Sequence, residues 1–253
     1  MKKPKLTIFI GLIIATLLSL VCAYWFFFSK PTTFLTDEQL LEELNSTFKG
    51  VDAKTIQDKI FIDDHHVVVP FVSTENEYSL SYWEWKMRKW QVATIENSGE
   101  LRLWKIDQND PSSYQFVWNI HPEDQLSTIS IYLIRERGFI ISDEEERYFP
   151  KVQMVKTIDL AEQPYGVMQL PEDWVAFMEE SNKIESPNTS GFLFNNFQTR
   201  YSMHFGWIGA DQSGNVAYPE HSFNGQSYSI SNIDLEYVMI LNEQEIEQPS
   251  KNN

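Results

Sequence analysis

The chain begins with one long segment that has no charged residue. Residues 6–28 read LTIFIGLIIATLLSLVCAYWFFF, a run of 23 residues without Asp, Glu, Lys or Arg. As an α-helix with a rise of about 1.5 Å per residue, this run would be roughly 35 Å long. The hydrocarbon core of a bilayer is about 30 Å thick. The sequence therefore predicts a membrane-spanning helix, and residues 6–28 are the expected contact with the membrane.

The residues around this segment predict its orientation. Three lysines and no acidic residue precede it, while Tyr24 and Trp25 lie near its far end. Lysines near a membrane helix favour the cytoplasmic side, and Tyr and Trp prefer the interface between lipid and water. We expect a single-pass protein of the cell membrane with residues 1–5 in the cytoplasm and the C-terminal domain outside.

Two processed forms compete with this uncleaved anchor. Val21 and Ala23 loosely meet the small-residue requirement of a signal peptidase, but the apolar core of a signal peptide normally has about 7 to 15 residues. A lipoprotein would carry its lipid on Cys22, where the preceding Val21 is branched and not small. We adopt the uncleaved anchor and interpret Cys22 as an apolar residue of the helix.

The acidity of the chain belongs to the part that follows the anchor. The chain has 20 Lys plus Arg and 36 Asp plus Glu, a formal net charge of −16. Because residues 1–29 hold three lysines and no acidic residue, residues 30–253 carry −19. Such a domain repels phosphate backbones, so no nucleic-acid partner is expected. Glycine-rich phosphate-binding motifs are absent, so no nucleotide is expected either. The single cysteine excludes an internal disulfide. A domain without disulfides suits the exterior of a bacterium that does not rely on them.

Residue patterns divide the rest of the chain into three parts. Residues 29–57 are expected to form a linker and a short amphipathic helix, which begins with a capping box at Thr36 and Gln39. Residues 58–241 alternate between apolar and polar positions in short runs separated by turn residues, the pattern of β-strands. Residues 242–253 form a polar tail.

The fold class follows from this order of elements. Pro171 is expected to open a second short helix. We predict a mainly β (α+β) domain, an antiparallel β-meander in sandwich or barrel-like form with two short helices, preceded by the transmembrane helix. The expected strands cover residues 59–62, 66–72, 78–85, 89–96, 101–106, 114–120, 128–134, 151–158, 201–208, 225–231 and 235–241.

Asp63, Asp64, His65 and His66 form the densest group of potential metal ligands in the sequence. Carboxylate and imidazole groups both suit Zn²⁺ or Mn²⁺. In an extended strand, however, neighbouring side chains face opposite ways, so a site here needs a turn and further ligands from elsewhere. The competing interpretation is a polar hairpin turn, because strand-like runs flank the group on both sides.

Trp83, Glu84 and Trp85 form a second candidate site. Alternation places Trp83 and Trp85 on one face of a strand. If that face is exposed, the two indoles form a platform for a sugar or a peptide. Alternatively, the two rings fill the core of the domain together with tryptophans from neighbouring strands.

No residue pattern identifies a catalytic centre. The sequence has no Gly-x-Ser-x-Gly and no His-Glu-x-x-His motif. His121, His204 and His221 stand far apart along the chain and are expected to be separate structural or surface residues. We therefore expect a non-catalytic binding module of the cell envelope without a cofactor, whose partner is another envelope protein or a glycan. The alternative is a glycan-binding or hydrolytic domain with the aromatic face as its site, assisted by a metal.

Overall fold

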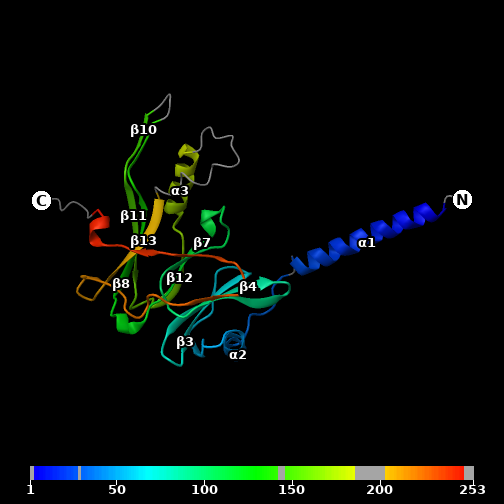
Figure 1. Ribbon diagram of the computed structural model, residues 1–253, viewed down its shortest axis with the longest axis horizontal. Helices are drawn as coiled ribbons and strands as arrows, with labels where there is room; N and C mark the ends of the chain where they lie inside the picture. Colours follow the sequence, from blue (N-terminus) through cyan, green and yellow to red (C-terminus); the bar gives the residue numbers. More distant parts are fainter. Residues whose placement is uncertain (1–2, 28–29, 142–145, 186–202, 248–253) are drawn as a thin grey trace.

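A computed structural model describes residues 3–27, 30–141, 146–185 and 203–247, and Figure 1 shows how its elements are arranged. Antiparallel sheets dominate the described residues, and no sheet of the described strands closes into a barrel. The predicted mainly β class is therefore confirmed, and the open sheets agree with its sandwich form. Residues 1–2, 28–29, 142–145, 186–202 and 248–253 of the predicted segments lie outside the described residues.

Helix α1 (Lys3–Phe27) projects away from the β-rich part of the molecule (Figure 1). It is long and apolar enough to cross a membrane. The side chains of its apolar window Phe9–Phe26 that the structure describes are exposed. The hydroxyls of Thr16 and Ser19 donate to the carbonyls four residues earlier, each at 2.9 Å. These bonds satisfy the two polar groups within the helix itself, as an apolar environment requires.

The first sheet follows a meander and contains six strands in the order β1-β3-β4-β5-β15, with β2 also paired to β3. The tight β4–β5 hairpin turns at Met87 and Arg88, both with positive φ. Its strands are β1 (Ala53–Ile56), β2 (Ile60–Phe61), β3 (His66–Ser73), β4 (Tyr78–Lys86), β5 (Lys89–Glu96) and β15 (Ser227–Ser229).

Pro70 lies inside this sheet, although a proline in a strand suggests an edge or a bulge. Strand β3 pairs with β4 on one side and with both β1 and β2 on the other. The carbonyl of Pro70 accepts from the N–H of Gln57 in the break between β1 and β2. Pro70 has no N–H to donate, and its nitrogen faces the break between β1 and β2. The sheet therefore loses no backbone hydrogen bond at this position.

Two further sheets and a hairpin complete the domain. The second sheet has the order β12-β7-β6-β16, and the third has the order β11-β8-β13-β14 with β17 parallel to β13. The second comprises β6 (Arg102–Lys105), β7 (Tyr114–Asn119), β12 (Tyr165–Gln169) and β16 (Asp234–Tyr237). The third comprises β8 (Thr128–Arg135), β11 (Val152–Asp159), β13 (Met203–Ala210), β14 (Val216–Ala217) and β17 (Met239–Ile240). Strands β9 (Gly138–Ile141) and β10 (Glu146–Phe149) pair with each other.

Hydrophobic contacts stack these sheets in layers. Helix α2 (Asp37–Thr47) has the predicted capping box and buries Leu40 and Leu44 against one face of the first sheet. The other face of that sheet packs on the second sheet, which packs in turn on the third sheet and on helix α3 (Glu172–Glu185). Strand β7 lies in the middle layer, and all six of its residues are buried. The loops that follow β7 therefore start from a rigid core.

A buried group of three charges lies between the first two sheets. The guanidinium of Arg102 pairs with Glu96, lies 3.9 Å from Glu100, and is covered by the ring of Tyr237. Burial raises the pKa of both carboxyl groups, although Arg102 acts in the opposite direction. This group thus holds two acidic side chains and one cation.

Replacing Arg102 tests how much this buried charge contributes. Arg102→Met leaves both carboxylates without their cation, so we expect the free energy of unfolding to fall by about 3–5 kcal/mol. Lys105→Met on the same strand is the control, because it breaks only a pair with the half-exposed Glu236 and a longer contact with the ring of Tyr114. Its expected loss is at most about 1 kcal/mol. Urea denaturation measures the unfolding free energy of both variants. Equal losses would contradict the stabilising role of the buried Arg102.

The raised pKa of Glu100 also predicts a pH dependence. A carboxyl whose folded pKa lies above its ordinary value of 4.5 binds more protons in the folded state, so stability falls as pH rises through that window. Glu100→Gln removes this loss of stability, because glutamine does not ionise. The variant should be more stable than the wild type at pH 7, and the difference should shrink as the pH is lowered towards 4.5. Thermal unfolding across this range measures it, and a difference that does not change with pH would refute the prediction.

Candidate functional site

Trp83 and Trp85 lie in the core. Trp83 is fully buried and Trp85 is 8% exposed. Phe34, from the linker after α1, packs edge-on against Trp83 with ring centroids 5.8 Å apart. Glu84 is 9% exposed and accepts from Lys86 and Ser231. The structure therefore matches the core interpretation of the two tryptophans, and neither offers the exposed face that the predicted ligand platform requires.

The group Asp63, Asp64, His65 and His66 forms the turn between β2 and β3. Asp63 accepts from the Nδ1 of His66 at 2.8 Å and from the backbone N–H of His65 at 2.7 Å. These bonds close a polar hairpin turn, which is the competing interpretation of the sequence. Within the described part of the chain, three potential metal ligands meet at another place.

That place is built from two loops that are far apart in sequence. The first loop follows β7 and enters the short helix η2 (Pro122–Asp124). The second is the loop 218–226 before β15. The loops bring together His121, Glu123 and His221, whose ligand atoms all lie within 4.8 Å of one another. We refer to these three residues as the histidine cluster.

A buried carboxylate fixes the two loops to each other. Asp124 is 8% exposed, and its two oxygens accept from three successive backbone N–H groups, those of Glu220 at 2.8 Å, His221 at 2.7 Å and Ser222 at 3.1 Å. In return, the hydroxyl of Ser222 accepts from the backbone N–H of His121 at 2.7 Å. We refer to these four bonds as the Asp124 clamp. They set the relative positions of all three members of the histidine cluster.

Hydrogen bonds and rings on both sides orient the imidazole of His121. Its Nδ1 accepts from the backbone N–H of Glu123 at 3.1 Å, so the proton of the neutral ring lies on Nε2. Nε2 is 3.0 Å from the carbonyl oxygen of Asn76 and donates to it. The ring of Tyr78 meets His121 edge-on, and the ring of His221 stacks on it with centroids 4.8 Å apart. His121 thus has a fixed position in the cluster.

The other two members are accessible to solvent. The side chain of His221 is 47% exposed and that of Glu123 is 66% exposed, and Nε2 of His221 is 3.6 Å from Oε2 of Glu123. The cluster lines a hollow of about 450 Å³ together with Glu75, Glu77 and Glu220. No Lys or Arg is among the described residues of this lining. Burial, and then the neighbouring Glu75, raise the pKa of Glu77, as expected in a negative hollow.

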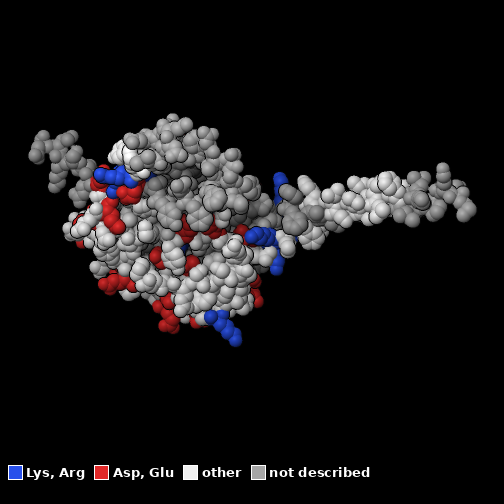
Figure 2. Space-filling model, turned by 45° about the horizontal axis from the view of Figure 1, so that its top comes forward, with Lys and Arg blue, Asp and Glu red and all other residues white. Residues whose placement is uncertain are grey.

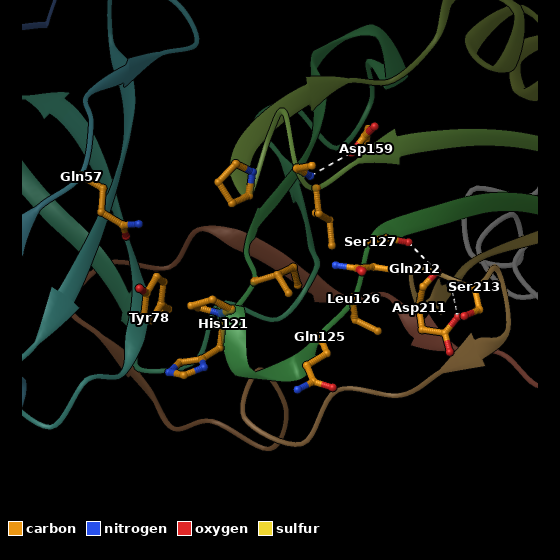
Figure 3. Close-up of a pocket in the computed structure, with 15 residues that line it drawn as sticks. Gln57, Tyr78, His121, Gln125, Leu126, Ser127, Asp159, Asp211, Gln212 and Ser213 are labelled. Atoms are coloured by element: carbon orange, nitrogen blue, oxygen red, sulfur yellow. Dashed lines mark hydrogen bonds between the residues drawn. The ribbon is translucent and has the colours of Figure 1, made fainter.

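A larger cavity lies on the other side of His121. Its volume is about 1120 Å³, and it shares Tyr78 and His121 with the smaller hollow. Figure 3 shows Tyr78 and His121 on one side of it and the β13–β14 turn, with Asp211, on the other. Asp159 and Asp211 are the charged groups among its described lining residues. Both cavities therefore suit cations and neutral polar groups better than anions.

Sequence reasoning missed the histidine cluster. His121 and Glu123 are two residues apart, which is a weak signal, and His221 follows 100 residues later. The expectation that His121 and His221 are separate residues is wrong, because the Asp124 clamp joins their loops. Asp124 itself carries no sequence signature of its role.

Removing the carboxylate of Asp124 tests the clamp. Asp124→Ala leaves three backbone N–H groups without their acceptor, so we expect a loss of about 2 kcal/mol or more in unfolding free energy. Hydrogen exchange at Glu220, His221 and Ser222 should accelerate. Asp211→Ala is the matched control, because Asp211 also accepts from backbone N–H groups but within an exposed turn. Unchanged exchange at residues 220–222 in Asp124→Ala would contradict the clamp.

No known protein family matches this chain, and no curated protein or solved structure shows significant similarity to it. The function must therefore be argued from the chemistry of the chain's own residues.

Proposed function

We propose that the protein is a single-pass membrane protein of the cell envelope whose outer domain is a non-catalytic binding module. The observation that carries the proposal is helix α1, which is apolar, has exposed side chains at residues 9–21 and 24–26, and precedes a folded acidic domain. In water, such an exposed apolar surface would be unfavourable, whereas a bilayer would cover it. The N-terminus lies in the cytoplasm in this proposal, and the domain lies outside a bacterial cell.

The way the chain leaves α1 supports this arrangement. Helix α1 ends at Phe27, and only five residues later the carbonyl of Thr32 accepts from the indole N–H of Trp90 at 3.0 Å. Five extended residues span at most about 18 Å. The face of the domain that carries Trp90 would therefore have to lie close to the lipid surface.

Cations gather at this face of an otherwise acidic domain. The tip of the β4–β5 hairpin has the sequence Lys86-Met87-Arg88-Lys89, and Met87 is 65% exposed. The guanidinium of Arg88 lies 3.9 Å from the centre of the Trp25 ring in α1. Figure 2 shows basic groups where α1 joins the domain, while acidic groups are spread over the visible surface with further basic groups at its upper left and lower edge. This distribution suits a domain whose basic tip rests on anionic headgroups.

The backbone of the tip adds to this argument. Met87 and Arg88 have φ of 50° and 63°. Two-residue turns with positive φ at both positions favour Asn-Gly, and large side chains there are strained. Strained backbone is often retained where a side chain has a functional role. Here the strained turn presents an apolar side chain, Met87, and a basic side chain, Arg88, close to α1.

The ligand of the module is proposed to bind in the two cavities around His121. The alternative function, a glycan-binding or hydrolytic domain that uses the aromatic face, lacks support because Trp83 is buried. A partner protein or a glycan with cationic or neutral polar groups would suit the acidic lining of the cavities.

Cysteine accessibility tests the topology in intact cells. In a Cys22→Ser background, a cysteine introduced by Ser213→Cys in the exposed β13–β14 turn should react with a membrane-impermeant maleimide. The matched variant Lys5→Cys should react only after lysis. The chain should also stay in the membrane fraction at alkaline pH and keep its N-terminus.

Three outcomes would contradict the proposal. Labelling of Lys5→Cys alone in intact cells would mean the opposite orientation. A mature chain that begins after residue 23 would show α1 to be a cleaved signal sequence. A wild-type chain that carries lipid on Cys22 would show a lipoprotein.

A further inference from the structure

We propose that His121, Glu123 and His221 bind one divalent transition-metal ion of the class that Zn²⁺ represents. This inference deepens the binding function proposed above by naming a ligand for the cavities around His121. It does not depend on the membrane anchor, because all three residues belong to the β-rich domain.

The three side chains offer a suitable set of ligand atoms. Two imidazoles and one carboxylate are ligands that zinc accepts in proteins, at about 2.0–2.2 Å from the ion. Two atoms bound to the same ion are therefore at most roughly 4 Å apart. The Nε2 of His221 and Oε2 of Glu123 already lie 3.6 Å apart, and all the ligand atoms lie within 4.8 Å. Because the rings of His121 and His221 are stacked, His221 must turn out of the stack to point a nitrogen at the same ion, and its exposed side chain leaves room for this rotation.

His121 has the support expected of a metal ligand. Metal-binding histidines usually donate their other ring N–H to a carbonyl or carboxylate, which fixes the ring. Here Nε2 donates to the carbonyl of Asn76, while Nδ1 accepts a bond of 3.1 Å from the N–H of Glu123. The ion would bind at Nδ1 and replace the bond from Glu123, while Nε2 keeps its bond to Asn76 and holds the ring in place. Binding through Nε2 would instead move the ring proton to Nδ1, where it would face the N–H of Glu123.

The surroundings of the cluster favour a cation. Glu75, Glu77 and Glu220 line the same hollow, and no Lys or Arg is among its described lining residues. Their combined potential concentrates divalent ions near the cluster. Nitrogen ligands, in turn, favour Zn²⁺ over Ca²⁺ and Mg²⁺, which prefer oxygen ligands alone.

The Asp124 clamp makes this more than a chance meeting of surface residues. It holds the backbone of His221 at 2.7 Å from a buried carboxylate and links the backbone of His121 to the same loop through Ser222. Preorganised ligands lose little freedom when the ion binds. With three protein ligands, a fourth position of the ion remains open towards the hollow.

Zinc binding to the full chain in detergent micelles tests the proposal. After chelator treatment, equilibrium dialysis against ZnCl₂ should give one zinc ion per chain. His221→Ala should weaken binding by at least tenfold, because loss even of a supporting residue changes metal affinity by about 10- to 100-fold. Co²⁺ should give the visible absorption of a tetrahedral site in the wild type and lose it in His221→Ala. Tryptophan fluorescence checks that this variant is folded.

His65→Ala is the matched control, because His65 is an exposed histidine of the β2–β3 turn and lies outside the cluster. It should bind zinc like the wild type. Zinc binding that His65→Ala abolishes and His221→Ala leaves intact would move the site to Asp63–His66 and overturn the proposal. Absence of zinc from the wild-type chain would overturn it as well. Because the assay uses micelles, either result leaves the test of membrane topology unaffected.

Discussion

The carboxylate of Asp124 is the contact on which the candidate site depends. It is buried, it accepts from three consecutive N–H groups of one loop, and it belongs to the loop that carries His121 and Glu123. Hydrogen bonds to an ionised acceptor are stronger than those between neutral groups. Without this carboxylate, the contacts left between His221 and His121 would include the stack of their rings and the bond from His121 to Ser222.

The stacked sheets position this contact and separate it from helix α1. Strand β7 lies in the middle layer and delivers His121 from a fully buried strand end. The first sheet carries Trp90, which takes the chain from α1 onto the domain, and the basic tip at Met87 and Arg88. The structure shows where the charges of the sequence lie. Cations gather where α1 joins the domain, and carboxylates surround the histidine cluster.

Sequence patterns predicted features that local physics determines. The apolar run gave α1, the capping box at Thr36 gave the start of α2, and alternation gave β3, β4 and β5 within a residue or two. Patterns could not show that β8 pairs with β11 and β13, because distant segments form those ladders. They also left the burial of Trp83 open, since it depends on distant segments that cover it, such as helix α2 and Phe34 of the linker. The histidine cluster depends on the Asp124 clamp. The residues of this clamp follow no periodic pattern in the sequence, so sequence analysis could not predict it.

The most direct test of the account is anomalous X-ray diffraction at the zinc edge from crystals of the zinc-loaded protein. We expect a single strong peak bounded by His121, Glu123 and His221, with the bonds between Asp124 and the second loop intact. A peak at Asp63–His66, or no peak within the domain, would contradict it.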